Sequence, residues 1–579
     1  MLRELHLPIW VLSLRRIKLQ ITGAQLIIEC LIEQGVDRVF GYPGGQVIPL
    51  YDALYMNRDR IKHILTAHEQ GASHAADGYA RSSGKVGVCI ATSGPGATNL
   101  VTGLATAYMD SSPVVAITGN VPVTLLGRDS FQEVDITGVT MPITKHNYIV
   151  KDKNELAATL REAFKIAKEG RPGPVLVDIP KNIQQDLIEY ERVEIEPVKR
   201  STSRLRDDDI EKAINLISLS ERPMCYIGGG VIRSDASAEL VEFIDRIDAP
   251  VCSSLMALGA VPSFNPRFTG MVGMHGTKVS NLMVNSCDLL IVIGARFSDR
   301  VISKGSTFAT QARILQLDID PAEFDKNIIS DSHVVGDIKE ILTILNSRLE
   351  KREHKDWMDR VQDAKRRFPM KVTLESKRPR EILKALDDVL STEKDAFVAT
   401  EVGQHQMWAA QYLKHNKPRH FLTSGGLGTM GFGTGAAIGA QIANPEARVV
   451  NVAGDGSFRM NCNELATIAR YKLPVVILVF NNHCLGMVRQ WQNLFFQKHY
   501  SETTLDTPLD WVMLANAYGV KGMRLKADDD AEAILKSAFE LNEGVVVDCE
   551  IPIDDKVLPM VAPGASINDM MGFIDNEGN

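Results

Sequence analysis

The stretch "VNVAGDGSF" at residues 450–458 is an apolar run that stops at one aspartate held between two glycines. An Ala/Leu-rich helical pattern follows, and then a second apolar run, "LPVVILVFNN" at residues 473–482, which ends in a pair of asparagines. Two predicted strands therefore end in oxygen-bearing side chains, Asp455 and Asn482, with one helix between them. Strands that alternate with helices in this way predict a parallel sheet covered by helices.

The polar ends of these two strands predict a site for a diphosphate and a metal ion. Gly454 and Gly456 let a bulky anion approach the backbone closely, at a turn that side chains would obstruct. Because the Asp455 carboxylate would repel a phosphate, a cation must lie between them, and Asp and Asn oxygens suit Mg²⁺. We therefore predict that Asp455 and Asn482, with a backbone carbonyl near Cys484, hold a diphosphate through Mg²⁺. The alternative is a generic strand–turn–helix with a solvated aspartate, since an isolated G-D-G is common.

Length and composition exclude several classes of protein. The 579 residues, 45% of them hydrophobic and 23% charged, indicate a soluble globular protein of about three or four domains. The net charge of −8 is spread along the chain, so we expect no nucleic-acid partner. No apolar stretch approaches the roughly 18 residues of a membrane span, so we expect no membrane association. The eight cysteines form no C-x-x-C motif, which predicts reduced thiols in a cytoplasmic protein.

Apolar strand-like runs alternate with helical patterns in three blocks, at residues 22–185, 208–345 and 380–550. Charge-rich segments at residues 189–209 and 350–371 separate the blocks and are predicted to be linkers or surface helices. The predicted fold class is α/β, with three doubly wound domains whose sheets are mostly parallel. The predicted boundaries are 1–20 for an N-terminal extension, 21–188, 208–349 and 378–555 for the three domains, and 556–579 for a C-terminal segment.

The first twenty residues differ from the rest of the chain. Their charged start and short apolar patch resemble a signal peptide, but Pro8 interrupts the patch and no small-residue cleavage site follows it. We therefore predict a disordered or loosely attached extension.

The first and third blocks resemble each other. Residues 71–99 and residues 433–461 both contain a small-residue helical pattern, a short loop, an apolar strand and then Gly-x-Gly. The first copy has Pro95 between its glycines, where the third has Asp455. If the likeness is genuine, only the third copy kept an acidic ligand. The alternative is chance similarity between Ala/Gly-rich segments.

The middle block contains two strand patterns typical of nucleotide-binding folds. "ERPMCYIGGGVIRS" at residues 221–234 enters a glycine run, and "ILQLDIDPAEFDKN" at residues 314–327 ends its strand at Asp318 and Asp320. An acid at a strand end is a typical acceptor for ribose hydroxyls. The glycine run is not a G-x-G-x-x-G, so this motif alone is weak.

The G-D-G turn followed by the Asn pair resembles the thiamine-diphosphate signature. The likeness continues along nearly the whole chain, which resembles the catalytic large subunits of the acetolactate (acetohydroxyacid) synthase family. The motifs that carry it are, in order, "VFGYPGGQVIPLYDAL", "AHEQGASHAADGYAR", "TSGPGATN", "GRPGPVLVDIPK", "GMHG", "GARFSDR", "EVGQHQMWAAQY" and "NNHCLGMVRQWQ".

The resemblance implies a thiamine-diphosphate-dependent transferase that also binds Mg²⁺ and FAD. Such an enzyme decarboxylates pyruvate and condenses the two-carbon unit with a second 2-ketoacid, pyruvate or 2-ketobutyrate. The products, 2-acetolactate or 2-aceto-2-hydroxybutyrate, begin the common pathway to valine, leucine and isoleucine. The resemblance also implies a structural FAD, a homodimer or tetramer, and a separate small regulatory subunit.

The resemblance assigns roles to residues that would be unremarkable alone. Glu69 matches a glutamate that hydrogen-bonds the aminopyrimidine and makes its imino nitrogen the base; alone, it would favour a helix start. Met430 matches the apolar residue that bends the cofactor into a V; alone, it would indicate core packing. Gly428 leaves a backbone carbonyl open to the pyrimidine amine. Gln132 and Lys181 are also implied to be catalytic.

The stretch "MVRQWQNLFF" at residues 487–496 follows the Asn pair at helical spacing. Met487 and Trp491 are four residues apart and so share one face. Packing of this face into the core is one interpretation; the resemblance implies that Trp491 lines the site of the acceptor ketoacid. It further implies that the pyrimidine and the diphosphate are held by domains of different subunits.

For the middle block the resemblance implies FAD, with contacts from Arg171, His275, Gly294, Arg296, Asp318 and Asp320. The alternatives are a domain that has lost its nucleotide, or one that binds ADP as in oxalyl-CoA decarboxylases.

Two other functions compete with carboligation. An oxidoreductase of the pyruvate-oxidase type would use the same cofactors with a redox-active flavin, and a non-catalytic relative would act as a binding module. Trp491 and the C-terminal "VLPMVAPGASINDMM" favour a synthase. The joint presence of Glu69, Asp455 and Asn482 argues against a non-catalytic relative.

Overall fold

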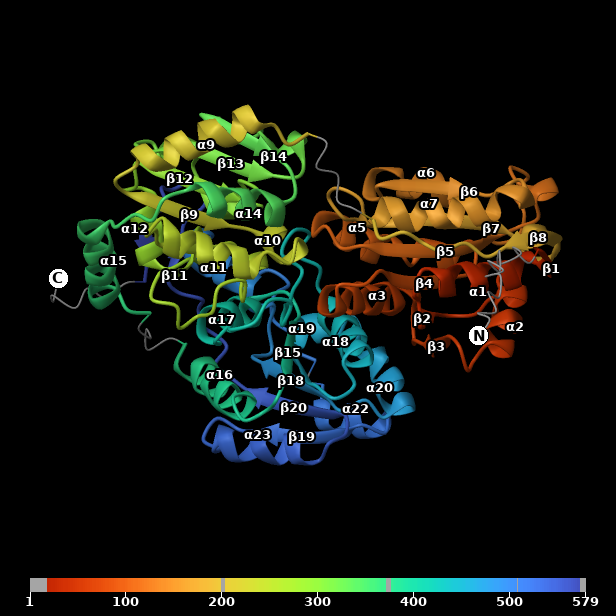
Figure 1. The fold of residues 1–579 in the computed structure, drawn as a ribbon. Helices are drawn as coiled ribbons and strands as arrows, with labels where there is room; N and C mark the ends of the chain where they lie inside the picture. Colours follow the sequence, from red (N-terminus) through yellow and green to blue (C-terminus); the bar gives the residue numbers. More distant parts are fainter. Residues whose placement is uncertain (1–17, 199–203, 371–375, 508, 573–579) are drawn as a thin grey trace, which may run out of the picture.

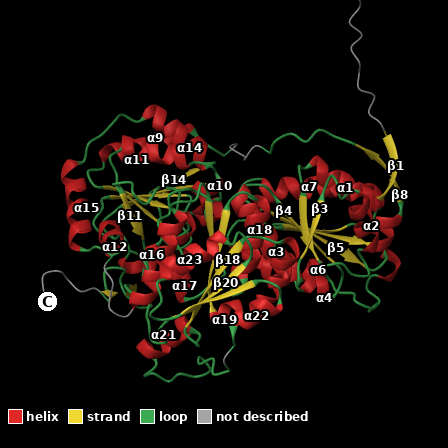
Figure 2. Cartoon of the chain, turned by 90° about the horizontal axis from the view of Figure 1, so that it is seen from below, coloured by secondary structure: helices red, strands yellow, loops and turns green. Residues whose placement is uncertain are grey.

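The computed structural model describes residues 18–198, 204–370, 376–507 and 509–572. They form three α/β units, each built on a six-stranded parallel sheet (Figure 1). Helices flank the sheets, as the view from below shows (Figure 2). The predicted fold class is confirmed. The predicted extension falls mainly on residues 1–17, which lie outside the described residues.

The first and third sheets have the same strand order. Counted along the chain within each sheet, the order is 2-1-3-4-6-5 in both. The first sheet contains β2 (Arg38–Gly41), β3 (Lys62–Leu65), β4 (Gly87–Ala91), β5 (Val114–Asn120), β6 (His146–Ile149) and β7 (Val175–Pro180). The third contains β15 (Ala396–Thr400), β16 (Phe421–Leu422), β17 (Arg448–Gly454), β18 (Val475–Asn481), β19 (Lys521–Leu525) and β20 (Val545–Glu550). The likeness between the two sequence blocks therefore reflects a shared topology.

The middle sheet has a different order, 3-2-1-4-5-6, which is the order of dinucleotide-binding folds. Its strands are β9 (Pro223–Ile227), β10 (Val251–Ser253), β11 (Phe268–Met271), β12 (Leu289–Ile293), β13 (Arg313–Asp318) and β14 (Ser332–Val335). Strand order reverses between β9 and β12, and a ligand crevice lies at such a switch point. The glycine run follows β9 at this point.

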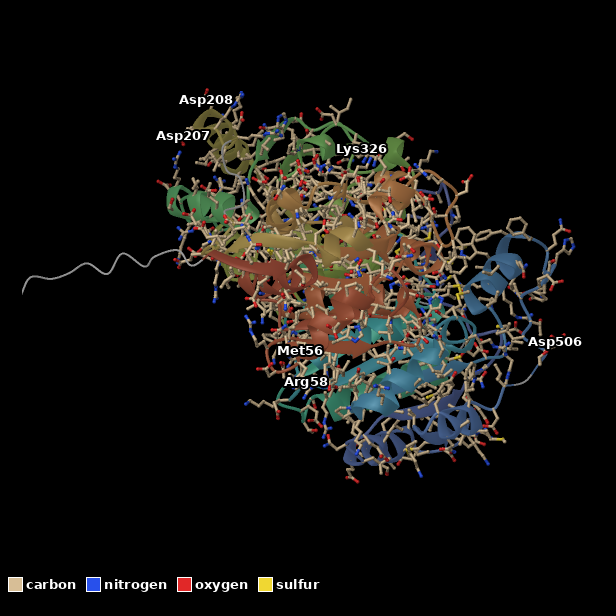
Figure 3. The ribbon with its side chains drawn as sticks, turned by 90° about the vertical axis from the view of Figure 1, so that its right-hand side faces the viewer. Met56, Arg58, Asp207, Asp208, Lys326 and Asp506 are labelled. Carbon is tan, nitrogen blue, oxygen red and sulfur yellow. The ribbon has the colours of Figure 1, made fainter. Side chains whose placement is uncertain are left out.

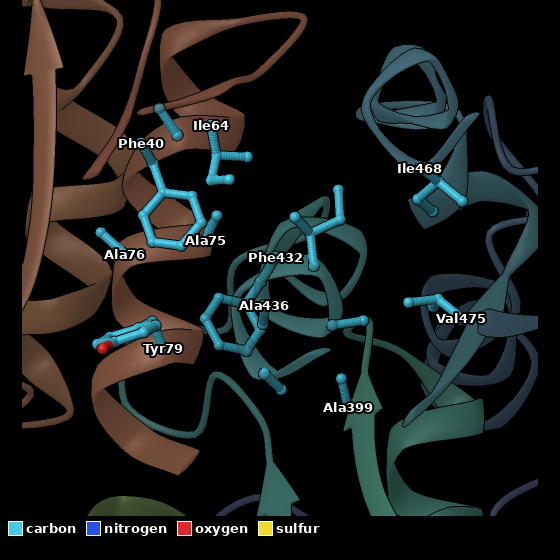
Figure 4. Close-up of a cluster of buried hydrophobic side chains, with 14 of the residues drawn as sticks. Phe40, Ile64, Ala75, Ala76, Tyr79, Ala399, Phe432, Ala436, Ile468 and Val475 are labelled. Carbon is cyan, nitrogen blue, oxygen red and sulfur yellow. The ribbon is translucent and has the colours of Figure 1, made fainter. Parts of the chain in front are cut away.

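The first and third units share one hydrophobic core. Helix α3 (Glu69–Ser83) packs against α18 (Phe432–Ala443), and side chains from both units meet there (Figure 4). The approach is close because small residues line it: a Cβ at Gly78 would overlap the backbone of Ala436. This packing fixes the position of Glu69, the first residue of α3, relative to the third unit.

The charge-rich segments between the units were predicted to be linkers or surface helices, and their described residues include both irregular chain and helices. Residues 18–20, which we assigned to the extension, lie in β1 (Lys18–Thr22), which pairs antiparallel with β8 (Leu187–Glu191). Helix α9 (Asp207–Leu219) begins with acidic residues, which suit a helix N-terminus; Figure 3 shows Asp207 and Asp208 at the surface. Helix α15 (Lys355–Arg367) buries Trp357 against the middle unit.

The C-terminal segment folds back onto the middle unit. Its strands β21 (Met560–Val561) and β22 (Met570–Met571) pair antiparallel, and Val561 N donates a hydrogen bond of 2.8 Å to Met274 O. Asn281 Nδ2 also donates to Ile567 O at 2.9 Å. Within the part of the chain that the structure describes, no helix combines the length and apolar character needed to cross a membrane.

Candidate active site

Asp455 is a buried carboxylate with spare ligand capacity. Strand β17 ends at Gly454, and Asp455 opens the short helix α19 (Asp455–Phe458). The side chain is 2% exposed and its Oδ2 has no hydrogen-bond partner. Burial raises the pKa of Asp455 to about 7, because the charged form loses its water. An unsatisfied oxygen in this position fits a cation ligand.

Asn482 lies at the same edge of the sheet. It follows β18, which pairs in parallel with β17, so both strands end on one side. Its Oδ1 accepts a hydrogen bond of 3.3 Å from Cys484 N. Among the described residues no group of three or more His, Cys, Asp or Glu side chains could hold a metal ion. A site with one carboxylate and one amide fits Mg²⁺, which takes most of its ligands from phosphate and water.

A polar residue at this edge, His405, was missed by the sequence reasoning. Helix α17 (Gln404–Tyr412) begins here, and a Cβ at Gly454 would come within 2.6 Å of His405 Nδ1. His405 is 5% exposed, its Nε2 has no partner, and burial lowers its pKa to about 3. A neutral imidazole beside a helix N-terminus fits a phosphate group. The available signal was "EVGQHQMW", in which polar residues follow an apolar strand, as Asp455 does.

Glu401 links two turns of the site through hydrogen bonds. The side chain is 0% exposed, and its Oε2 accepts hydrogen bonds from Gly431 N at 2.7 Å and Ser457 Oγ at 2.9 Å. Ser457 follows the G-D-G turn, whereas Gly431, with φ of 87°, follows the half-buried Met430. One buried carboxylate therefore fixes the turn predicted to hold diphosphate relative to the turn predicted to bend the cofactor.

A cavity of about 1470 Å³ is lined by residues of all three units. Of the predicted cofactor residues it brings together Arg171, His275, Gly294, Arg296, Asp318 and Gly428. The glycine run after β9 also lines it, and a Cβ at Gly228 would overlap the backbone of Gly294. The volume exceeds the roughly 300–1,000 Å³ of common small-molecule pockets, which fits a ligand of dinucleotide size.

Charged groups at the middle-unit end of the cavity hold one another in place. Arg171 donates to Glu323 Oε1 at 2.8 Å, to Asp320 Oδ2 at 3.2 Å and, through Nε, to Ser111 Oγ at 2.8 Å. Asp320 does not line the cavity, whereas Asp318 does, and burial raises the pKa of Asp318 to about 7. Glu323 is a cavity residue that the sequence reasoning missed.

Trp491 lies in the wall of the same cavity. Helix α21 (Gly486–Phe495) presents Met487, Val488 and Trp491 to it, and the only fully buried residue of this helix is Gln490. Trp491 is half-buried and meets the Phe495 ring edge-on, with centroids 5.6 Å apart. The helix begins beside Asn482, because a Cβ at Gly486 would come within 2.8 Å of Asn482 Nδ2. Met487 and Trp491 therefore both line the cavity, and Met487 also packs against the hydrophobic core of the third unit.

Three predicted catalytic residues lie elsewhere. Glu69, Gln132 and Lys181 do not line this cavity. They follow β3, β5 and β7, so they stand beyond the carboxyl ends of the first sheet. Glu69 accepts a hydrogen bond of 3.0 Å from Asn99 Nδ2, and the Gln132 backbone lies against Gly94. Asp455, Asn482 and Met430 do not line the cavity either, so the candidate site residues lie at the carboxyl edges of two different sheets and in the cavity wall.

Comparison with known proteins finds relatives over almost the whole length. Residues 21–139, 210–345 and 401–549 match, in turn, the N-terminal TPP binding domain, the central domain and the C-terminal TPP binding domain of thiamine pyrophosphate enzymes. A probable acetolactate synthase large subunit of Methanocaldococcus jannaschii is 49% identical over 565 residues, which are 95% of each chain. The acetolactate synthase isozyme 2 large subunit of Escherichia coli is 46% identical over 558 residues, 95% of this chain and 99% of the relative. The acetolactate synthase large subunit of Porphyra purpurea is 45% identical over 568 residues, 95% of each chain.

Proposed function

This chain belongs to the acetolactate synthase large-subunit family of thiamine pyrophosphate enzymes, and from that premise we propose the reaction that it performs. It decarboxylates pyruvate and joins the remaining two carbons to a second 2-ketoacid, pyruvate or 2-ketobutyrate. The observation that carries this proposal is the course of α21, which begins beside Asn482 and runs Trp491 into the cavity wall. This arrangement places the apolar Trp491 on the helix that begins beside Asn482, a proposed metal ligand. An acceptor ketoacid can bind against this wall.

The residues divide between holding the cofactor and handling protons. When bound, thiamine diphosphate supplies the carbon nucleophile and the electron sink for decarboxylation. We propose that Asp455 and Asn482 would hold Mg²⁺ and, through it, the diphosphate, and that His405 would donate a hydrogen bond to a phosphate group. The Glu69 carboxylate, oriented by Asn99, shares a proton with the pyrimidine nitrogen.

The placement of the two residue groups at the edges of different sheets supports a homodimer. In this proposal the carboxyl edge of the first sheet, with Glu69, Gln132 and Lys181, faces the cofactor held by the third unit of a second copy, with Gly428 and Met430. A tetramer would be a pair of such dimers. The relatives are named large subunits, which implies a separate small subunit, and we propose that it regulates this chain. The free state of all eight cysteines supports a reducing, cytoplasmic location.

The middle unit is proposed to bind FAD as a structural group. Its strand order and the residues around Arg171 and Asp318 support a dinucleotide ligand. One observation favours an oxidase as second candidate: a single cavity joins this region to Gly428 and Trp491.

Anaerobic incubation with pyruvate separates the two candidates. The purified chain, loaded with thiamine diphosphate, Mg²⁺ and FAD, should form acetolactate without any electron acceptor. Turnover of pyruvate that begins only after an electron acceptor is added would support the oxidase and contradict the synthase. The Glu69→Gln variant is the matched control, since it should bind cofactor and give little product by either route.

A further inference from the structure

Glu464 is a carboxylate of the third unit that is buried against the first. It ends the short helix η8 (Cys462–Glu464) and is 0% exposed. Its oxygens accept hydrogen bonds from Ala67 N at 3.1 Å, from His68 N at 3.1 Å and from Thr467 Oγ1 at 2.6 Å. The two amides belong to the two residues immediately before Glu69. Both donate to Glu464, which lies far from them in sequence.

These contacts make Glu464 a cap for α3 that comes from another unit. The first amides of a helix have no partner within it and carry partial positive charge, which a carboxylate complements. The His68 side chain caps one amide further along the helix, because its Nδ1 accepts from Gln70 N at 3.1 Å. Close approach of Glu464 depends on Gly71, where a Cβ would overlap the carboxylate.

We propose that Glu464 is a positioning residue for Glu69, which it sets in place through the amides of Ala67 and His68. The inference rests on the proposed function, in which Glu69 contacts the pyrimidine of the cofactor. Asn99 orients the Glu69 carboxylate from one side, and Glu464 fixes the backbone that carries it. Asn99 thus holds the carboxylate of Glu69, and Glu464 holds the backbone immediately before it.

The segment that contains Glu464 also contacts the site residues around Met430. Three residues before Glu464, Asn461 Nδ2 donates to Gly431 O at 2.6 Å, beside Met430. A stretch that starts at Asp455 and ends at Glu464 therefore positions residues of both groups. Loss of the Glu464 contacts alone would move Glu69 while leaving Asp455 and Asn482 in place.

The test compares Glu464→Gln with the unmodified chain, each loaded with thiamine diphosphate and Mg²⁺. Glutamine keeps the volume but turns an amide donor toward at least one backbone N–H. Exchange of the cofactor C2 proton in deuterated buffer, followed by NMR, should slow about 10- to 100-fold, the cost of a small misplacement. Cofactor affinity, measured by titration, should stay within about threefold, because Asp455 and Asn482 are untouched.

Two further variants make the result decisive. Thr467→Val removes the third partner of Glu464 but neither amide contact, and it should exchange at nearly the rate of the unmodified chain. Glu69→Gln is the reference for a lost proton contact and should be slow. If Glu464→Gln does not fold, Glu464→Asp, which retracts the carboxylate by one methylene, replaces it with the same expectation.

A folded Glu464 variant that exchanges at the unmodified rate, while Glu69→Gln is slow, would overturn the inference and leave the proposed function intact. Unmodified exchange in Glu69→Gln would instead remove the proposed role of Glu69, and the positioning role with it. Slow exchange in Thr467→Val as well as in Glu464→Gln would also count against the amide contacts, because it would assign the effect to general packing.

Discussion

Replacing Glu401 by alanine should loosen two turns of the cofactor site at once. Its Oε2 holds Gly431 N and Ser457 Oγ, and its Oε1 accepts from Thr434 N at 3.1 Å and Thr434 Oγ1 at 3.2 Å. The alanine variant leaves two backbone amides and two hydroxyls without this acceptor. Because Glu401 is fully buried, water does not replace it without opening the turns.

The magnitude follows from the number of donors. A buried amide without a partner costs about 1–3 kcal/mol, so the two amides together cost at most about 2–6 kcal/mol. The 3.3 Å contact of Gly431 N with Ser457 Oγ lowers this figure. The hydroxyls rotate toward other acceptors and add little. Burial raises the pKa of Glu401, so keeping it charged already costs free energy, which the variant recovers. The net loss should therefore lie near the lower half of the range, about 2–4 kcal/mol. Glu401→Gln keeps one acceptor and should lose about half as much.

Denaturant unfolding and cofactor titration check this prediction together. The unfolding midpoint of Glu401→Ala should fall, and thiamine diphosphate affinity should fall with it, because Gly431 and Ser457 lose their common anchor. Ser457→Ala is the matched control: it removes one donor, leaves Gly431 held and should show a small effect on both. If Glu401→Ala matched the unmodified chain in both measurements, a joint anchor at Glu401 would be refuted.

Three shorter predictions concern the metal turn, the cavity wall and acid stability. Asp455→Ala should lower thiamine diphosphate affinity by about 100-fold and abolish its dependence on Mg²⁺; a normal titration would reject the metal site. Trp491→Leu should preserve pyruvate self-condensation and lower the preference for 2-ketobutyrate about tenfold, since one methylene is worth about 1–3 kcal/mol; an unchanged product ratio in a mixed-substrate competition would contradict it. Burial lowers the pKa of His74 to about 4, so the unfolded chain binds more protons between pH 4 and 6.5. Stability should fall as pH drops through this window, by at most about 1.4 kcal/mol per pH unit from this residue, and His74→Gln should flatten the measured slope.

Much of the fold could be predicted because its signals are local. Buried parallel strands are continuous apolar runs, and the residues that end them are neighbours of those runs in sequence. Asp455 and Asn482 were therefore identifiable as a pair, since each closes such a run and one helix separates them. The matching order of the first and third sheets was likewise signalled by two similar stretches of sequence.

Residues whose partners lie far away in sequence could not be predicted. Glu464 follows "RMNCN" with no feature that marks it, and the Ala67 amide that it accepts from lies 397 residues away. Glu401 opens the motif "EVGQHQMWAAQY", but only the folded turns show that it joins Gly431 to Ser457. The roles of Glu464 and Glu401 therefore depend on contacts that form only when the chain folds.

Glu401, Asp455 and Glu464 are three of the buried carboxylates of the third unit, and their hydrogen bonds separate their roles. Each loses water on folding, so each must gain partners or remain costly. Glu401 and Glu464 have their oxygens occupied by backbone amides and hydroxyls, which leaves them little capacity for a ligand and suits them to hold turns and a helix end. Asp455 alone of the three keeps an oxygen that no described donor reaches. A chain that buries this oxygen without a partner is stabilised when a cation arrives. Cofactor loading with Mg²⁺ should therefore raise the unfolding midpoint of the unmodified chain and leave that of Asp455→Ala nearly unchanged.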